Sequence, residues 1–101
     1  KDPFINTVEF KNYEQFRAFD KKIDRALNEK NDLSVNFIVN YQASNPEYWV
    51  VYYKVGQYYQ QKKWYNAAAK QYKTALNKEI TTLLDRAEIQ KKYQKVTRKI
   101  K

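Results

Sequence analysis

Apolar residues recur at intervals of three and four along most of the chain, which is the period of an amphipathic helix. The pattern is interrupted at four places and predicts helices over residues 12–30, 32–43, 47–61, 64–77 and 82–100. Residues 1–11 contain Pro3 and scattered apolar positions without a helical period, so an extended arm is predicted there. We therefore expect an all-α fold, an antiparallel array of about five helices in a single domain over residues 12–101.

Polar and proline residues mark the predicted helix boundaries. Asn12 is followed three residues later by Gln15, a capping-box spacing that predicts the start of the first helix. Pro46 disfavours helical geometry at the residue before it and suits the first turn of the helix that follows. Thr81 or Thr82 is expected to cap the last helix.

Each predicted helix has one apolar face that we expect to be buried. In chain order, these faces comprise Tyr13, Phe16, Phe19, Ile23, Ala26 and Leu27; Leu33, Phe37, Ile38 and Tyr41; Tyr48, Tyr52, Val55 and Tyr59; Trp64, Ala68, Tyr72, Ala75 and Leu76; and Leu83, Ala87, Ile89, Tyr93, Val96 and Ile100. The chain has one glycine and two prolines, too few turn residues for an all-β fold of hairpins.

The single glycine, Gly56, lies inside a predicted helix, where glycine costs roughly 0.5–1 kcal/mol relative to alanine. The residues around it resemble the signature of the tetratricopeptide repeat, a helical hairpin, over residues 46–79. The matching positions are Tyr52, Val55, Gly56, Tyr59, Ala68, Tyr72 and Ala75, with Pro46 at the repeat boundary. The proline that would end this repeat, near Ile80, is missing.

The resemblance implies a close crossing of two helices, with the small residues Gly56 and Ala68 opposite one another and Tyr52 and Tyr59 in the core. A shift of one repeat back or forward places Lys22 or Gln90 at the glycine site, so residues 12–45 are either a degenerate repeat or another helical pair. Residues 82–100 are expected to form the helix that caps the array.

The resemblance also implies a docking function for a protein or peptide partner. Binding is expected in a groove between the helices over 12–30 and 47–61, on the face that such repeats present to ligands. The predicted partner-binding residues are Val50, Tyr53, Gln57 and Gln60. The alternative is that the aromatic rings here pack on the first two helices. The side chains at 50, 53 and 57 do not offer the lysine clamp with which chaperone-binding members hold a carboxylate.

The net charge of +9 is confined to the second half of the chain. Residues 1–45 hold seven basic and seven acidic residues, which leaves 13 of the 20 basic and 4 of the 11 acidic residues in 46–101. This asymmetry favours an acidic protein partner or an acidic surface of the same polypeptide. The alternative is nucleic acid, because lysines neutralise phosphates and tyrosines stack on bases. Arg86 and Arg98 are the only arginines of the basic half.

The chain lacks the residue types on which most catalysis depends. It has no His and no Cys, and a single glycine cannot build a phosphate-binding loop. Asp20 and Asp24 lie one turn apart among Lys21, Lys22 and Arg25, a pattern typical of a solvated, salt-bridged helix face. We therefore predict a non-catalytic chain without metal or cofactor. Its longest apolar run has six residues, far short of the ~20 of a membrane span.

The sequence begins with Lys1 and contains no Met, so we expect it to be a segment of a longer chain. The stretch EITTLLDRAEIQKKYQ (79–94) resembles the C-terminal ends of penicillin-acyltransferase-like hydrolases. The alternative function implied by this resemblance is that of a C-terminal accessory domain of a larger hydrolase or acyltransferase. No compartment or oligomeric state is predicted.

Overall fold

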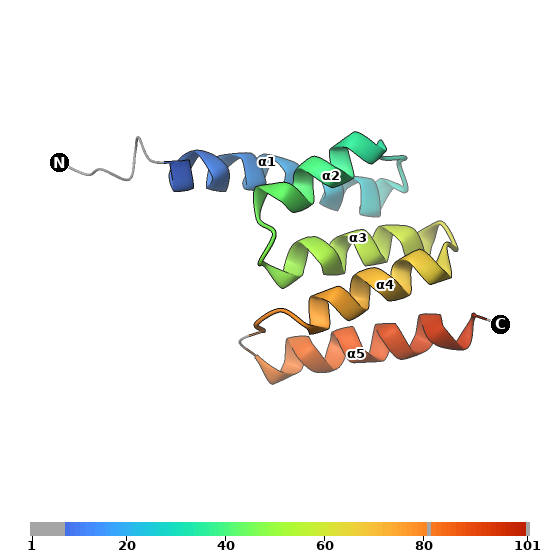
Figure 1. Ribbon diagram of the computed structural model, residues 1–101. Coiled ribbons are helices and arrows are strands. Elements are labelled where there is room, and N and C mark those ends of the chain that lie inside the picture. Colours follow the sequence, from blue (N-terminus) through green and yellow to red (C-terminus); the bar gives the residue numbers. More distant parts are fainter. Residues whose placement is uncertain (1–7, 81, 101) are drawn as a thin grey trace. The chain divides into compact units, whose positions relative to one another are not determined.

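Five α-helices make up the regular structure of residues 8–80 and 82–100, the residues that the computed structural model describes. In chain order they are α1 (Val8–Glu29), α2 (Val35–Ser44), α3 (Trp49–Gln61), α4 (Tyr65–Leu76) and α5 (Leu83–Arg98) (Figure 1). No strand occurs in these described residues. The prediction of an all-α helical array is confirmed.

The chain divides into two compact units, residues 1–46 and residues 47–101. The first unit contains α1 and α2, and the second contains α3, α4 and α5. That residues 12–101 act as a single domain stays a prediction.

Helix α1 begins at Val8, four residues before the predicted start at Asn12. Residues 8–11 are therefore helical and do not belong to an extended arm, and the capping box predicted at Asn12 is wrong. None of residues 8–11 breaks a helix, and an asparagine inside a helix costs only a few tenths of a kcal/mol, about 0.7 at most. The rest of the predicted arm, residues 1–7, lies outside the described residues.

Side-chain caps fix the starts of α2 and α5. The Ser34 hydroxyl accepts a hydrogen bond from the Phe37 backbone N–H at 3.0 Å, so α2 begins at Val35 and not at residue 32 or 33 as predicted. Thr82 accepts from the Asp85 N–H at 3.1 Å and donates to the Asp85 carboxylate at 2.7 Å. These bonds satisfy N–H groups that have no partner within the helix. The cap predicted at Thr82 is confirmed.

Two helices end in the same way, with a lysine in the left-handed region. Lys30 follows α1 with φ 59°, and Lys63 follows α3 with φ 64°. In each case the next residue donates its N–H five residues back: Asn31 to the Ala26 carbonyl at 3.0 Å, and Trp64 to the Tyr59 carbonyl at 2.9 Å. This is the Schellman ending, in which glycine is the usual left-handed residue.

In the first unit, α1 and α2 pack against each other and bury Phe16, Ile23, Ala26, Phe37, Ile38 and Tyr41. The Tyr41 ring stacks on Phe16 with ring centroids 6.0 Å apart, and its hydroxyl donates to Asp20 Oδ1 at 2.6 Å. The apolar faces predicted for these two helices are therefore buried or half-buried where their side chains are described, and the predicted Tyr13 side chain lies outside that description. Asp20, predicted to lie on a salt-bridged face, also accepts this internal hydrogen bond.

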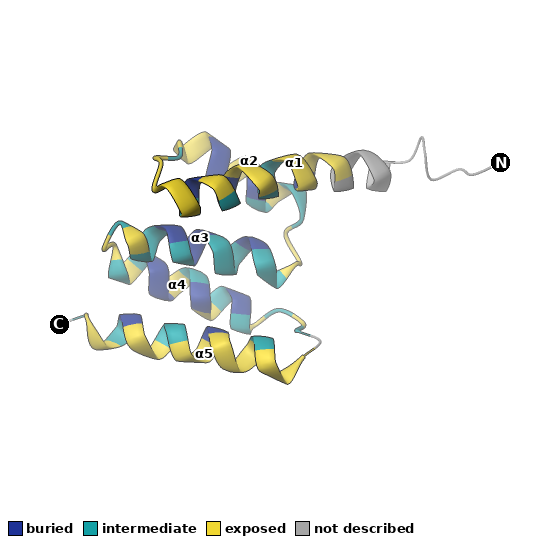
Figure 2. Ribbon diagram, turned by 180° about the vertical axis from the view of Figure 1, so that it is seen from behind, coloured by how far each residue is buried: buried dark blue, intermediate teal, exposed yellow. Residues whose placement is uncertain are grey.

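In the second unit, α4 packs against both α3 and α5 and supplies the centre of the core. The buried residues of this unit are Val51, Val55, Gly56, Tyr58, Ala68, Ala69, Tyr72, Ala75, Ile89 and Val96. Figure 2 shows buried residues along both α3 and α4, whereas most of α5 is exposed.

Several burial predictions for the second unit are wrong. Tyr58 is buried, while Tyr52 and Tyr59 lie only partly buried at the edge of the core. Trp64, expected to face inward, is 53% exposed because it precedes the first residue of α4 and lies against rings of α3.

Leu83 and Ala87 are also exposed, contrary to the prediction. The buried stripe of α5 runs through Ile89 and Val96, seven residues apart. At about 100° per residue, Leu83 and Ala87 lie roughly 120° and 160° around the helix from Ile89, away from α4.

Candidate docking surface

Helices α3 and α4 are in tight contact at Gly56 and Tyr72. A Cβ placed on Gly56 would lie 2.6 Å from Tyr72 Cε1 and 2.7 Å from Tyr72 Cδ1, closer than real carbon contacts allow. The Tyr72 ring is fully buried, so moving it aside would disturb the core around it. The prediction that Gly56 permits a close approach of two helices is confirmed. The atoms nearest to that Cβ belong to Tyr72, and the predicted pairing of Gly56 with Ala68 stays a prediction.

The hydroxyl of Tyr72 is held by a residue of α3. It donates to Gln60 Oε1 at 2.6 Å, and burial raises the pKa of Tyr72 well above its usual range. The bond satisfies a polar group that would otherwise cost free energy in the core. Gln60, predicted to contact a partner, therefore has an internal role in holding α4 against α3.

Tyr53, another predicted partner-binding residue, joins α3 to α5. Its ring lies 6.0 Å from that of Tyr72 and 5.8 Å from that of Trp49, measured between centroids. Its hydroxyl donates to Glu88 Oε2 on α5 at 2.7 Å. Burial first, and then the bond to Glu88, raise the pKa of Tyr53 above its usual range. Since α3 and α5 both pack on α4, this bond closes the three-helix unit.

The other two predicted partner-binding residues, Val50 and Gln57, are each half-buried on α3. They are seven residues apart, and Tyr53 lies three residues after Val50. All three therefore share one face of the helix. The structure thus brings Val50, Tyr53 and Gln57 together and gives Tyr53 a second, internal contact. The groove predicted between the first and third helices would involve both units, and it stays a prediction.

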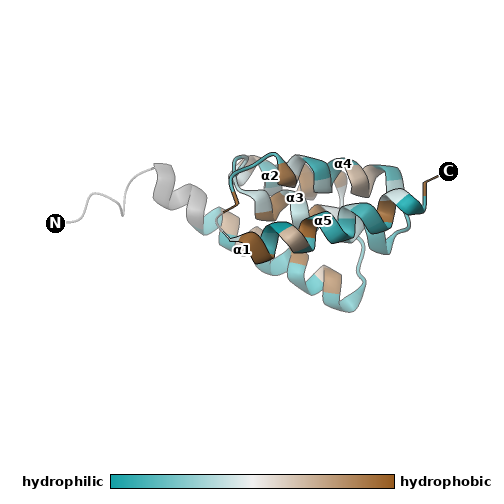
Figure 3. Ribbon diagram, turned by 90° about the horizontal axis from the view of Figure 1, so that it is seen from below, coloured by the Kyte–Doolittle hydropathy of each residue, from teal (hydrophilic) through white to brown (hydrophobic). Residues whose placement is uncertain are grey.

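The outer side of α5 carries a surface that the sequence analysis missed. Leu83 and Leu84 at its start are 85% and 84% exposed. Figure 3 shows this first turn as hydrophobic, in brown, and the C-terminal part of α5 as mostly hydrophilic. Lys91, Lys95 and Arg98 are exposed there. In the sequence, Leu84 precedes these three cations by 7, 11 and 14 residues. This spacing places all four residues on one face of a helix and could have indicated the surface.

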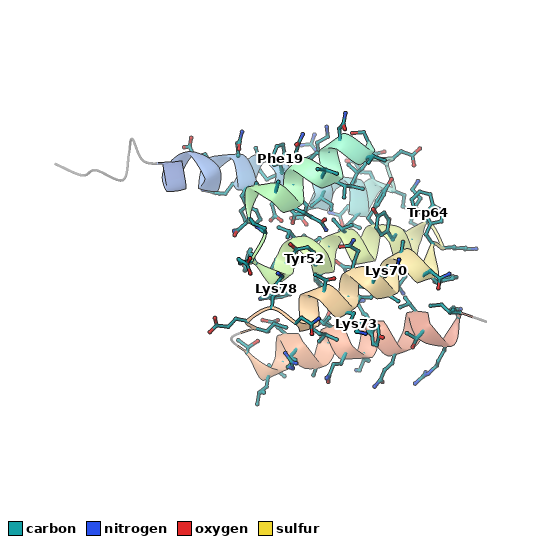
Figure 4. The ribbon with its side chains drawn as sticks, in the orientation of Figure 1. Phe19, Tyr52, Trp64, Lys70, Lys73 and Lys78 are labelled. Atoms are coloured by element: carbon teal, nitrogen blue, oxygen red, sulfur yellow. The ribbon has the colours of Figure 1, made fainter. Side chains whose placement is uncertain are left out.

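Other cations of the basic half serve contacts within the unit. Lys78 Nζ lies 3.4 Å from Glu47 Oε1 and 5.3 Å from the centre of the Tyr52 ring (Figure 4). Lys62 lies over the Tyr58 ring, and Arg86 donates to the Leu76 carbonyl at 3.2 Å. The net charge of this unit therefore overstates the number of cations available to a partner.

The first unit has a hollow of about 400 Å³ beside the C-terminal half of α1. Its polar lining comes from Lys21, Lys22, Arg25, Asn31 and Asp32. The Lys22 ammonium also lies 5.1 Å from the centre of the Phe37 ring. Within residues 8–80 and 82–100, no group of three or more His, Cys, Asp or Glu side chains is arranged to hold a metal ion.

Comparisons with known proteins add no relative. No family model matches the chain, and neither the curated proteins nor the solved structures include a match. The resemblance to tetratricopeptide repeats therefore stays a prediction from the residues themselves. In the described part of the chain, no helix has the length and apolar character needed to cross a membrane.

Proposed function

We propose that the chain is a non-catalytic docking module of the tetratricopeptide-repeat type, which binds another protein or another domain of its own polypeptide. The observation that carries the proposal is the packing of the Tyr72 ring against Gly56. Both residues are positions of the repeat signature, and a large ring on α4 fills the space left by the missing side chain on α3. The pairing explains why the one glycine of the chain lies in a helix interior.

Val50 and Gln57 are the α3 residues that we propose to contact the partner. Tyr53 and Gln60 support this surface from within, because their polar atoms are engaged by Glu88 and by the Tyr72 hydroxyl. An acidic partner is favoured by the excess of cations in residues 46–101.

A selection of displayed random peptides on the immobilised chain tests the proposal. We expect a recurring sequence to be enriched and its affinity to fall about tenfold for Val50→Asp/Gln57→Glu, the loss of roughly 1.4 kcal/mol. The matched control is Asn66→Asp/Gln90→Glu, which makes the same change in charge at exposed positions of α4 and α5. This control should keep the affinity within about twofold.

The proposal is contradicted if no sequence is enriched, or if both double variants lose affinity equally. Circular dichroism and urea unfolding of each variant exclude loss of fold as the cause of weaker binding.

A further inference from the structure

We propose that the outer strip of α5, defined as Leu84, Lys91, Lys95 and Arg98, binds an acidic segment of a partner protein. Apolar side chains of that segment would meet Leu84 and the adjacent Leu83, and its carboxylates would meet the three cations. This inference rests on the proposed docking function and names a surface and a partner chemistry for it.

The four residues of the strip lie on one side of α5. At about 100° per residue they fall within an arc of roughly 60°, and at about 1.5 Å per residue they extend over some 21 Å of the helix. The leucine is at the N-terminal end and the cations occupy the last two turns. Glu88, which accepts a hydrogen bond from the Tyr53 hydroxyl, lies on the same side between them, so a partner segment of similar length meets an apolar contact at one end and a cationic surface at the other.

The strip is available because α5 uses its opposite side for packing. Ile89 and Val96 are buried against the second unit's core. Within the described residues, no side-chain hydrogen bond, ion pair or ring contact engages Lys91, Lys95 or Arg98. The neighbouring cation Lys99 differs, since it lies 6.0 Å from the centre of the Tyr65 ring.

The two leucines favour a protein partner over nucleic acid. Phosphates would gain from the cations, but Leu83 and Leu84 offer neither hydrogen bonds nor an aromatic surface on which a base can stack. Tyr93, the tyrosine of α5, is partly buried against the core. An apolar pair beside a cationic surface instead complements a segment that carries both leucine-like and acidic side chains.

A membrane surface and a second copy of the chain fit less well. A helix that lies on a membrane inserts a continuous apolar face, and the apolar face of α5 is already packed on α4. A second copy brings a net charge of +9, and its residues 46–101 hold 13 basic against 4 acidic residues. Like charges at this density oppose self-association through the strip.

The test uses a fluorescein-labelled acidic peptide of about 18 residues, long enough as a helix to span the strip, with a leucine pair at one end and glutamates at the 0, 4 and 7 spacing. Binding to the full chain is followed by fluorescence anisotropy at about 50 and 300 mM salt, since exposed charge pairs are screened by salt. Two further peptides replace all glutamates by glutamine or both leucines by serine.

We expect the acidic peptide to bind, and its affinity to fall about tenfold at the higher salt and about tenfold in Lys91→Gln/Lys95→Gln/Arg98→Gln. Leu83→Ser/Leu84→Ser should weaken binding about fivefold by removing apolar contact. The matched control Lys63→Gln/Lys70→Gln/Lys73→Gln removes the same charge at exposed positions outside α5 and should stay within about twofold.

The inference is overturned if the acidic peptide does not bind at low salt, or if the control triple variant loses as much affinity as the strip variant. It is also overturned if polyuridylate or phosphatidylserine vesicles bind in a strip-dependent way while the peptide does not. Failure here leaves the docking function intact when a displayed peptide binds the chain and is lost from Val50→Asp/Gln57→Glu. Failure of both experiments removes the docking function as well.

Discussion

The Tyr72 ring occupies the space where Gly56 would otherwise carry a side chain, with its nearest carbon 2.6 Å from the position of a Cβ. An alanine at 56 would gain about 1 kcal/mol of helix propensity. It would also force the buried ring to move, and overpacking of this kind costs typically 1–3 kcal/mol or more. We therefore expect Gly56→Ala to lower the free energy of unfolding by up to about 2 kcal/mol in urea titrations, once the propensity gain is subtracted.

The control for this substitution is Gly56→Ala in a Tyr72→Leu background, where the ring is absent. There the alanine should be neutral or stabilising, because the propensity gain is no longer opposed. A stabilising effect of Gly56→Ala in the otherwise unchanged chain would show that the ring does not constrain this position.

Replacing the donor and replacing the acceptor of the Tyr72–Gln60 hydrogen bond should lower the stability by different amounts. Tyr72→Phe removes the hydroxyl together with its need for a partner and should cost about 0.5–1.5 kcal/mol. Gln60→Ala leaves the hydroxyl of a fully buried tyrosine without its acceptor and should cost about 1–3 kcal/mol. Chemical denaturation of the two variants measures the order, and a larger loss in Tyr72→Phe would contradict it.

Tyrosine ionisation should limit stability at high pH. Burial raises the pKa of Tyr53 and of Tyr72 in the folded chain, and Glu88 raises that of Tyr53 further. The unfolded chain loses these protons near pH 10, its ordinary value, while the folded chain keeps them. The stability linked to the two hydroxyls is therefore complete below about pH 10 and is lost as the pH rises above it.

Urea midpoints between about pH 9 and 11.5 measure this decline across the ordinary tyrosine pKa. Tyr53→Phe/Tyr72→Phe should have lower stability at pH 9 and a shallower fall above pH 10, because neither position can ionise. Equal slopes in the variant and the unchanged chain would contradict the assignment of the decline to these two residues.

The lysines with positive φ after α1 and α3 are positions where we expect a substitution to stabilise the chain. Glycine adopts positive φ without the steric cost that Lys30 and Lys63 bear at φ 59° and 64°. Part of that gain is offset because glycine loses more entropy on folding. Each of Lys30→Gly and Lys63→Gly should raise the free energy of unfolding by about 0.5–1 kcal/mol in urea titrations. Lys73→Gly, inside α4, is the control and should destabilise by about 1 kcal/mol.

The apolar period was sufficient to predict five helices in the right order, because the same spacing that marks a helix also marks the face that it buries. The cap at Thr82 was predictable because a threonine directly before a helical pattern commonly caps the helix. The start of α1 was missed because Asn12 has a capping residue's chemistry, yet no residue between 8 and 11 stops the helix. A capping residue can start a helix, but it does so only where the residues before it are not helical themselves.

The candidate surface was less predictable from the sequence. The signature located Gly56, but it could not show that the Tyr72 ring fills the space beside it, because that depends on the rotation of α4 about its axis. The same limit applies to Tyr53 and Gln60, which hold hydroxyl contacts inside the unit. The exposure of Leu83 and Leu84 depends on which side of α5 meets α4, and helical spacing alone does not fix this.

We propose that residues 47–101 present a protein-docking surface on α3 and α5. Titration of the ¹⁵N-labelled chain with a peptide selected by display, followed by amide chemical shifts, tests this proposal. We expect the largest shifts at Val50 and Gln57 on α3 and along the outer strip of α5. Shifts confined to residues 8–46, or no shifts at saturating peptide, would contradict it.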